Sequence, residues 1–198
     1  MTNVTKVAFM DRREAVPALI GDASDFLIIS GLAGAAKDVG AITKESPNTF
    51  LFGGCMGGAS MTALALAMSQ PERRVLLVTG DGEILMSLGS LATIGALQPK
   101  NLSVLIIDNE LYGETGDQAT HTSFGVDLQG VATNCGFGNT QLVTTKDQIP
   151  EASKLLRQSN GPCFVVMKVA GGLPGNYSRN WHAEETKLAF RKALLGTR

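Results

Sequence analysis

Short apolar runs alternate with amphipathic stretches along most of this chain. Two runs, 74–79 and 102–107, are apolar at nearly every position, as in parallel strands that helices cover on both faces. Other strands are expected at 26–29, 49–52, 141–143 and 163–169. Helices are expected at 59–68, 84–97, 127–135, 148–159 and 183–195. The alternation predicts an α/β fold with a doubly wound, mainly parallel sheet, helices on both faces and right-handed crossovers, in a single domain over residues 1–198.

Composition narrows the classes of partner. Hydrophobic residues make up 44% of the 198 residues, and 17 Lys and Arg nearly balance 18 Asp and Glu, so no net field favours nucleic acid or an anionic membrane. The three cysteines, Cys55, Cys135 and Cys163, form no CxxC pair that would indicate a local zinc or iron–sulfur site. The charged N-terminus lacks the apolar run of a signal peptide, and no span-length apolar stretch occurs, so we expect a cytoplasmic protein.

Three polar or glycine-rich segments follow predicted strands, at 53–58, 80–83 and 108–116. In a parallel sheet, the carboxyl ends of the strands meet at one edge, where ligands bind. The segment 110–125 has no apolar periodicity and is longer than an ordinary connection, which is typical of functional loops. We therefore expect all three segments to line one site.

Gly80-Asp81-Gly82 closes one of these strands before a helix that is expected to begin at Glu83. The glycines allow a close backbone approach, and free N–H groups at a helix start suit a phosphate. A carboxylate there would repel a bare phosphate unless a cation such as Mg²⁺ lay between them. The alternative is that Asp81 caps the helix.

Asp108 and Asn109 end the next strand, after the 25 residues 83–107. A helix and a parallel strand of that length return the chain to the same edge. The Asn109 amide oxygen and a backbone carbonyl near Leu111 can then join Asp81 around one ion. The alternatives are a turn residue for Asn109 and a structural carboxylate for Asp108, and for Asp108 we favour the alternative.

Together, the GDG sequence, the spacer and the D-N pair resemble the cofactor motif of thiamine diphosphate enzymes, and nearly the whole chain resembles their diphosphate-binding domain. The resemblance implies thiamine diphosphate and Mg²⁺ as cofactors, with Asp81, Asn109 and the Leu111 carbonyl as metal ligands. It further implies cofactor contacts from Gly80, Gly82, Glu83, Tyr112 and Gly113.

The glycine-rich segment 53–58 strengthens the resemblance. By position, the Gly54 carbonyl would accept a hydrogen bond from the pyrimidine amino group, with Cys55 beside it, and Met56 would support the bent cofactor. Alone, a methionine after glycines is more often part of the core. In the family, a glutamate from a second, pyrimidine-binding domain activates the cofactor, and no glutamate of this chain has that context. A separate partner subunit is therefore expected to supply it.

Residues 107–118 are similar to two groups: sulfopyruvate and phosphonopyruvate decarboxylases, and the β subunits of 2-oxoacid:ferredoxin oxidoreductases, which usually read TGGQ at 115–118. Residues 86–94 look more like the decarboxylases. This resemblance implies the β subunit of a non-oxidative 2-oxo acid decarboxylase that releases an aldehyde. The alternatives are a subunit of a 2-oxoacid oxidoreductase or carboligase, and a non-catalytic cofactor-binding module. A nucleotide-binding fold is disfavoured because neither GxGxxG nor GxxxxGK[ST] occurs.

The loop 115–123 is the expected substrate wall, in which Gln118, Thr120, His121 and Thr122 could hydrogen-bond a sulfonate or phosphonate. Gln118 and His121 are the candidate catalytic residues. A solvated loop histidine is the alternative for His121. Arg12, Arg13 and Arg179 could reach an anionic substrate, but we expect each on the solvated surface.

Overall fold

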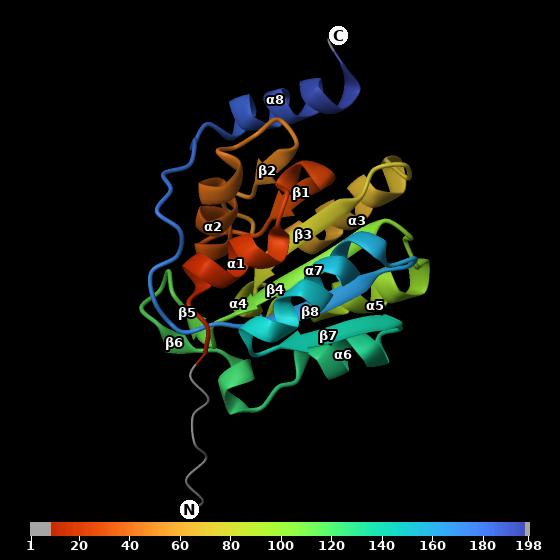
Figure 1. Ribbon diagram of the computed structural model, residues 1–198. Helices are drawn as coiled ribbons and strands as arrows, with labels where there is room; N and C mark the ends of the chain where they lie inside the picture. Colours follow the sequence, from red (N-terminus) through yellow and green to blue (C-terminus); the bar gives the residue numbers. More distant parts are fainter. Residues whose placement is uncertain (1–8, 197–198) are drawn as a thin grey trace, which may run out of the picture.

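A parallel six-stranded sheet forms the centre of the molecule, with strand order β2-β1-β3-β4-β8-β7 (Figure 1). The computed structural model describes residues 9–196. Residues 1–8 lie outside the described residues. They are part of the N-terminal segment from which we expect no signal peptide. The strands of the sheet are β1 (Leu27–Ser30), β2 (Thr49–Leu51), β3 (Val75–Gly80), β4 (Leu102–Asp108), β7 (Asn139–Val143) and β8 (Cys163–Lys168).

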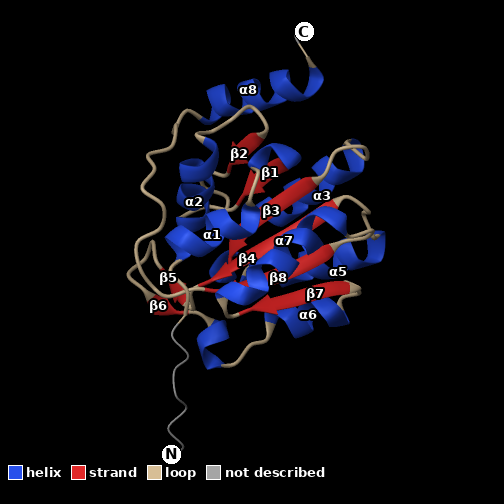
Figure 2. Cartoon of the chain, viewed as in Figure 1, coloured by secondary structure: helices blue, strands red, loops and turns tan. Residues whose placement is uncertain are grey.

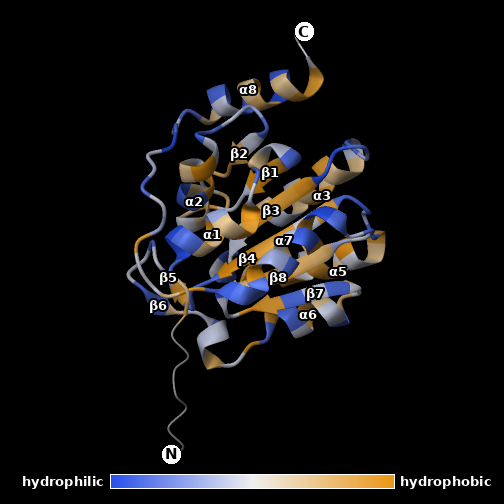
Figure 3. Ribbon diagram, viewed as in Figure 1, coloured by the Kyte–Doolittle hydropathy of each residue, from blue (hydrophilic) through white to orange (hydrophobic). Residues whose placement is uncertain are grey.

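Helices cover both faces of this sheet (Figure 2). Alternate residues of one strand point into two separate cores: Leu76 and Val78 into one, Val75 and Leu77 into the other. The first core is closed by α1 (Arg12–Ile20), α2 (Gly34–Thr43) and α7 (Ile149–Gln158). The second is closed by α3 (Ala59–Ser69), α4 (Asp81–Leu85), α5 (Leu88–Leu97) and α6 (Leu128–Asn134). Burial on both faces explains the unbroken apolar strands in Figure 3 and confirms the predicted α/β fold.

The last helix, α8 (Ala183–Leu195), lies beside the edge strand β2 rather than over the centre of the sheet (Figure 1). Phe190 of α8 packs on Phe50 of β2, with ring centroids 5.9 Å apart. The segment 170–182 that leads to α8 has no regular secondary structure and runs past α2. Within the described residues, no helix is both long and apolar enough to cross a membrane.

Some local predictions were wrong. The helix expected at 84–97 is interrupted at Met86 and Ser87 and forms two helices, α4 and α5. Gly57 of the glycine loop lies next to this interruption. Helix α4 also begins at Asp81 rather than Glu83. Helices α1 and α2 were not predicted. The segment 110–125 is partly ordered: it holds a two-stranded hairpin, β5 (Leu111–Tyr112) and β6 (Gln118–Ala119), and the 3-10 helix η2 (His121–Phe124). Two further 3-10 turns are η1 (Ala23–Asp25) and η3 (Lys146–Gln148).

The order of the strands creates a crevice beside β1. From β1 the chain winds outward to β2 and then returns to β3 on the other side of β1. The loops that leave the carboxyl ends of β1 and β3 therefore diverge, which opens a ligand-sized space between them. The predicted metal and phosphate residues follow β3 and β4 and so border this space.

Gly95 and Gly89 lie in the same helix but have opposite surroundings. A Cβ at Gly95 would collide with the Cys135 carbonyl oxygen at the end of α6, whereas a Cβ at Gly89 would meet nothing within 4 Å. We predict that Gly95→Ala lowers the free energy of unfolding by about 2 kcal/mol or more through overpacking, while Gly89→Ala is neutral or stabilises by up to about 1 kcal/mol. Urea denaturation of the two variants measures this difference. Equal stability of the two would contradict the close α5–α6 contact.

Candidate functional site

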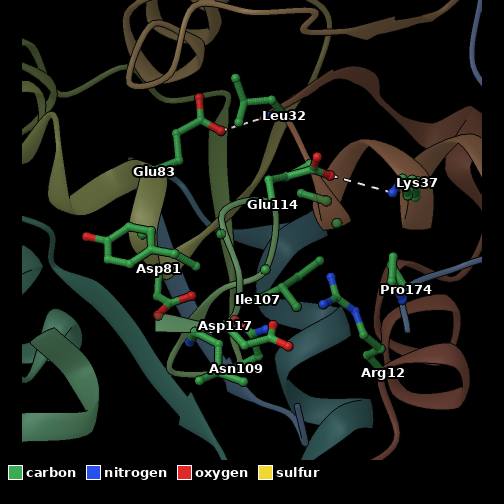
Figure 4. A pocket seen from close by; sticks show the side chains of 18 of the residues that line it. Arg12, Leu32, Lys37, Asp81, Glu83, Ile107, Asn109, Glu114, Asp117 and Pro174 are labelled. Carbon is green, nitrogen blue, oxygen red and sulfur yellow. Dashed lines mark hydrogen bonds and ion pairs between the residues drawn. The ribbon is translucent and has the colours of Figure 1, made fainter. Parts of the chain in front are cut away.

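A cavity of about 420 Å³ opens at the carboxyl edge of the sheet, between the loops after β1, β3 and β4 (Figure 4). Its remaining wall comes from the hairpin β5–β6 and from residues 172–174 of the segment before α8. Nine of the predicted cofactor residues line it: Met56, Gly80, Asp81, Gly82, Glu83, Asn109, Leu111, Tyr112 and Gly113. The structure therefore brings together the residues that follow two different strands, as the sequence pattern predicted.

Asp81 lies at the floor of this cavity with 1% of its surface exposed. Its Oδ2 atom accepts a hydrogen bond from Thr120 Oγ1 at 2.5 Å and lies 3.2 Å from Thr122 Oγ1. Both threonines are buried and come from the end of the hairpin and η2. Its other oxygen, Oδ1, faces Asn109 (Figure 4). The two oxygens of one carboxylate thus have different surroundings.

Three groups that carry oxygen atoms meet at one side of Asp81: its own Oδ1, the Asn109 side-chain amide and the Leu111 carbonyl. One terminal atom of the Asn109 amide lies 3.1 Å from the Leu111 carbonyl oxygen and 3.2 Å from Asp81 Oδ1. With the amide nitrogen at this end, Asn109 donates to both oxygens. Rotation of the amide by 180° would instead place its oxygen beside the Asp81 carboxylate and the Leu111 carbonyl. Neighbouring oxygens in a magnesium octahedron with bonds of about 2.1 Å lie about 3 Å apart. The residues therefore fit a small divalent cation.

This donor set differs from a cluster of charged ligands. Among the described residues, no group of three or more His, Cys, Asp or Glu side chains could hold a metal ion. A single carboxylate with neutral oxygens is typical of Mg²⁺ sites that are completed by water and by the phosphate oxygens of a ligand.

Asp108 has the structural role expected of it. It is 1% exposed, and its Oδ2 pairs with Lys168 Nζ at 2.8 Å while its Oδ1 accepts from Thr122 Oγ1 at 2.9 Å and from the Glu110 N–H at 3.1 Å. Lys168 also pairs with Glu110 at 2.8 Å. Burial acts to lower the pKa of Lys168, but the hydrogen bonds and charges of the two carboxylates outweigh it, so its pKa is raised. Lys168 is therefore a permanent countercharge for Asp108.

Asp81 has no such countercharge. Burial and, to a lesser degree, the nearby negative charge of Asp108 together raise the pKa of Asp81 to about 6, against the hydrogen bonds from Thr120 and Thr122. Without a cation, the chain therefore holds Asp81 as a carboxylate at neutral pH only at a cost in free energy. A bound divalent ion would supply the missing charge.

Glu83 connects two loops and the end of β3 through its side chain. Its Oε2 accepts hydrogen bonds from the Leu32 N–H at 2.8 Å and from Thr79 Oγ1 at 3.0 Å, and its Oε1 accepts from the Gly57 N–H at 3.2 Å. It is 5% exposed. The carboxylate of Glu83 thus fixes the cavity walls, a role that was not predicted. The predicted contact between Glu83 and the diphosphate involves its backbone and stays a prediction.

The predicted glycine loop borders the cavity only in part. Met56 lines it, but Gly54 and Cys55 are exposed and do not. A Cβ at Gly54 would meet nothing within 4 Å, so this part of the loop is open to a ligand or a partner.

The two candidate catalytic residues also lie outside the cavity lining. Gln118 and His121 are exposed on the hairpin and η2, and the Gln118 amide exchanges hydrogen bonds with Thr115 at 2.7 and 2.8 Å. The structure does not bring either side chain to Asp81, although both belong to the segment that covers it.

The sequence pattern missed the loop after β1. Residues 32–35 line the cavity, and Ala33, which precedes α2 without a side-chain cap, has φ +61°, a strained conformation for alanine. The turn at Ser30-Gly31 marked this strand end, but without polar side chains nothing distinguished it from an ordinary loop. Its position at the crevice depends on strand order.

Arg12 and Arg179 were both expected on the solvated surface, but Arg12 is buried and Arg179 is half-buried. Arg12 lines the cavity, is 6% exposed, and pairs with the buried Asp38 at 2.6 Å. Arg179 donates hydrogen bonds to the carbonyls of Phe52 and Gly53, at the start of the glycine loop, and its guanidinium lies 3.7 Å from the Trp181 ring centroid. Arg13, by contrast, is exposed and donates to the carbonyls of Leu173 and Pro174.

Comparisons with known proteins agree with this geometry. Sulfopyruvate decarboxylase subunit beta of Methanothermobacter thermautotrophicus is 41% identical over 94% of this chain and 97% of its own length. Sulfopyruvate decarboxylase of Methanosarcina acetivorans is 30% identical over 98% of this chain but only 50% of its own length. A thiamine diphosphate-dependent 4-hydroxybenzoylformate decarboxylase of Rhodococcus jostii has the same fold, with a TM-score of 0.69 at 16% identity over 87% of this chain and 35% of the other.

Residues 38–167 match the family described as thiamine pyrophosphate enzyme, C-terminal TPP binding domain. This match covers more than half of the chain, from α2 through β8, and contains Asp81, Asn109 and the loops around them. The chain therefore belongs to the thiamine pyrophosphate enzyme family, as its C-terminal, TPP-binding domain.

Proposed function

We propose that this chain is the cofactor-binding β subunit of a thiamine diphosphate-dependent 2-oxo acid decarboxylase that requires Mg²⁺. The convergence of Asp81 Oδ1, the Asn109 amide and the Leu111 carbonyl at the cavity is the observation that carries the proposal. The similarity to sulfopyruvate decarboxylase subunits over nearly the full chain supports the reaction class.

In this proposal, the carboxylate of Asp81, the amide oxygen of Asn109 and the carbonyl of Leu111 would hold Mg²⁺. The backbone at Gly80 and Gly82, which lines the cavity, would contact the diphosphate. The first turn of α2 borders the same space and has no side-chain cap, so its N–H groups are suited to the terminal phosphate. Leu32, Ile107, Leu111 and Tyr112 are among the apolar residues that line the cavity.

Thiamine diphosphate, when bound, supplies an electron sink for the bond to the carboxylate that leaves as CO₂. The chain itself orients the cofactor. Met56 lines the cavity wall near the predicted position of the cofactor rings, and the Gly54 carbonyl remains the proposed acceptor for the pyrimidine amino group. Gln118 and His121 remain proposed substrate contacts, from the exposed side of the hairpin.

A partner subunit is proposed to supply the activating glutamate. The two glutamates that line the cavity are already engaged: Glu83 by three hydrogen-bond donors and Glu114 by Lys37 at 3.5 Å. Met86, which follows α4 and lies beside Gly57 of the glycine loop, is 62% exposed. Phe124, which ends η2, a turn in contact with α4, is 79% exposed. Large exposed apolar side chains beside a site are suited to a protein interface. The name "subunit beta" of a relative also implies a second subunit in that enzyme.

We propose a 2-oxo acid with a sulfonate or phosphonate tail as the substrate. Non-oxidative release of CO₂, rather than transfer of electrons to a redox partner, distinguishes this proposal from an oxidoreductase subunit. Release of CO₂ and aldehyde from sulfopyruvate, phosphonopyruvate and pyruvate, without an electron acceptor, tests both the tail and the reaction type.

Calorimetric titration of thiamine diphosphate with Mg²⁺ into the chain co-purified with its partner tests the cofactor site. We predict that Asp81→Asn weakens binding about 100-fold or more, since it replaces the only charged metal ligand with a neutral one. Glu72→Gln, an equivalent change of charge in the exposed turn before the opposite end of β3, is expected to bind like the wild type. Magnesium-independent binding, or equal binding by both variants, would sink the proposed site.

The same substitution is predicted to stabilise the metal-free chain. Because the folded pKa of Asp81 is about 6, above its ordinary value of 3.8, the folded state binds this proton more tightly than the unfolded state. Its stabilising contribution is complete below about pH 4 and is lost as the pH rises through 6, a loss of about 2–3 kcal/mol. Asp81→Asn avoids this loss, so we predict higher stability than the wild type at pH 8 in EDTA.

Urea denaturation at pH 8 and at pH 4.5 measures the effect. The advantage of Asp81→Asn should shrink at the lower pH, where wild-type Asp81 is protonated in the folded chain. A substitution that destabilises the metal-free chain equally at both pH values would contradict the assigned cost of the buried carboxylate.

A further inference from the structure

The Thr120 hydroxyl binds one of the two carboxylate oxygens of Asp81 and not the other. Thr120 is 0% exposed, and its Oγ1 lies 2.5 Å from Asp81 Oδ2, on the side away from Asn109 and Leu111. Thr122 Oγ1 lies 3.2 Å from the same oxygen. The two hydroxyls therefore contact Oδ2, whereas Oδ1 faces the Asn109 amide.

The second hydroxyl is shared with the neighbouring carboxylate. Thr122 Oγ1 has one proton, and its distance to Asp108 Oδ1 is 2.9 Å, shorter than its distance to Asp81. It also lies 3.0 Å from Thr120 Oγ1. Because Asp108 is already paired with Lys168, its position is fixed, and Thr122 in turn limits the movement of the Thr120 hydroxyl. Thr120 thus makes the closer and better-defined contact with Asp81.

The backbone holds Thr120 in place independently of its hydroxyl. Its N–H donates to the Glu110 carbonyl at 2.9 Å, and its own carbonyl accepts from Ser123 Oγ at 2.6 Å. Its Cγ2 atom faces Gly82 at the start of α4. Replacing the hydroxyl with a methyl group therefore removes one hydrogen bond to Asp81 while the surrounding chain can stay where it is.

The choice of metal ion depends on how many carboxylate oxygens can bind it. Mg²⁺ requires a compact octahedron of single oxygens, whereas Ca²⁺ accepts more ligands and often binds both oxygens of one carboxylate. A carboxylate with one oxygen held by hydroxyl donors cannot turn to present both oxygens to an ion. Released from that hydrogen bond, the Asp81 side chain could rotate and chelate a larger cation.

We propose that Thr120 is a positioning residue that restricts Asp81 to single-oxygen ligation and thereby favours Mg²⁺ over Ca²⁺ in the cofactor site. This inference rests on the proposed function, because it assumes a divalent ion at Asp81. It adds to that function a determinant of metal selectivity in the segment 110–125, contributed by a side chain that does not itself ligate the ion.

Titration of thiamine diphosphate into the chain with its partner, once with Mg²⁺ and once with Ca²⁺, tests the proposal. Thr120→Val, which keeps the shape and loses the hydroxyl, is expected to weaken Mg²⁺-supported binding about tenfold and Ca²⁺-supported binding by less than about threefold. Thr120→Ser retains the hydroxyl and is expected to behave like the wild type. Thr93→Val, the same change at an exposed position of α5, is the control.

Equal losses with the two ions, no loss in Thr120→Val, or equal losses in Thr120→Val and Thr120→Ser would overturn the proposal. If Thr120→Val does not fold, Thr120→Ala compared with Thr120→Ser makes the same test of the hydroxyl. A wild-type complex that binds no thiamine diphosphate with either ion would instead overturn the proposed function. Wild-type binding with unchanged selectivity in the variants would leave the proposed function standing and reject the role of Thr120.

Discussion

The carboxylates of Asp81 and Asp108 are both buried where adjacent strands end, and much of the surrounding structure satisfies them. Two like charges removed from water are costly unless hydrogen bonds and countercharges offset the loss of solvation. Lys168, at the end of β8, pairs with Asp108, and the hydroxyls of Thr120 and Thr122 reach both carboxylates. The hairpin and η2 are therefore folded against the sheet largely because they carry these donors.

The uneven compensation of the two aspartates has a functional consequence. Asp108 has a lysine and two further hydrogen-bond donors, so it is satisfied by the protein alone. Asp81 has hydroxyl donors on one oxygen and other oxygens beside the second, an arrangement that a cation would complete. A ligand site of this kind lowers the stability of the empty protein and recovers that free energy on binding.

A third buried carboxylate, Glu83, gives the cavity its shape. It is held by two backbone N–H groups and one hydroxyl, which belong to the loops after β1 and β2 and to the end of β3. The opposite wall is fixed from the C-terminal side, where the Gly175 N–H donates to Asp38 and Arg179 donates to the carbonyls of Phe52 and Gly53. Segments far apart in the sequence thus set the width of one site.

The sequence alone determined the strands of the six-stranded sheet, the fold class and the members of the site that follow β3 and β4. Apolar runs without alternation indicate strands buried on both faces, and parallel strands place Asp81 and Asn109 at one edge whatever the details of packing. The GDG and D-N motifs, taken together with their spacing and their strand–helix–strand context, then carried the resemblance to thiamine diphosphate enzymes.

Only the tertiary structure decided which groups surround those residues. Thr120, Lys168, Arg12 and Arg179 form their contacts with residues 26 to 127 positions away, and hydrophobic periodicity carries no information about such pairs. The break between α4 and α5 and the cavity loop after β1 depend likewise on strand order and on packing against another segment. Local sequence determines which helix or strand each segment can form. The partner of a buried polar group, by contrast, depends on which segments meet in the fold. The physical reason is that an unpartnered polar group becomes costly only when folding removes it from water.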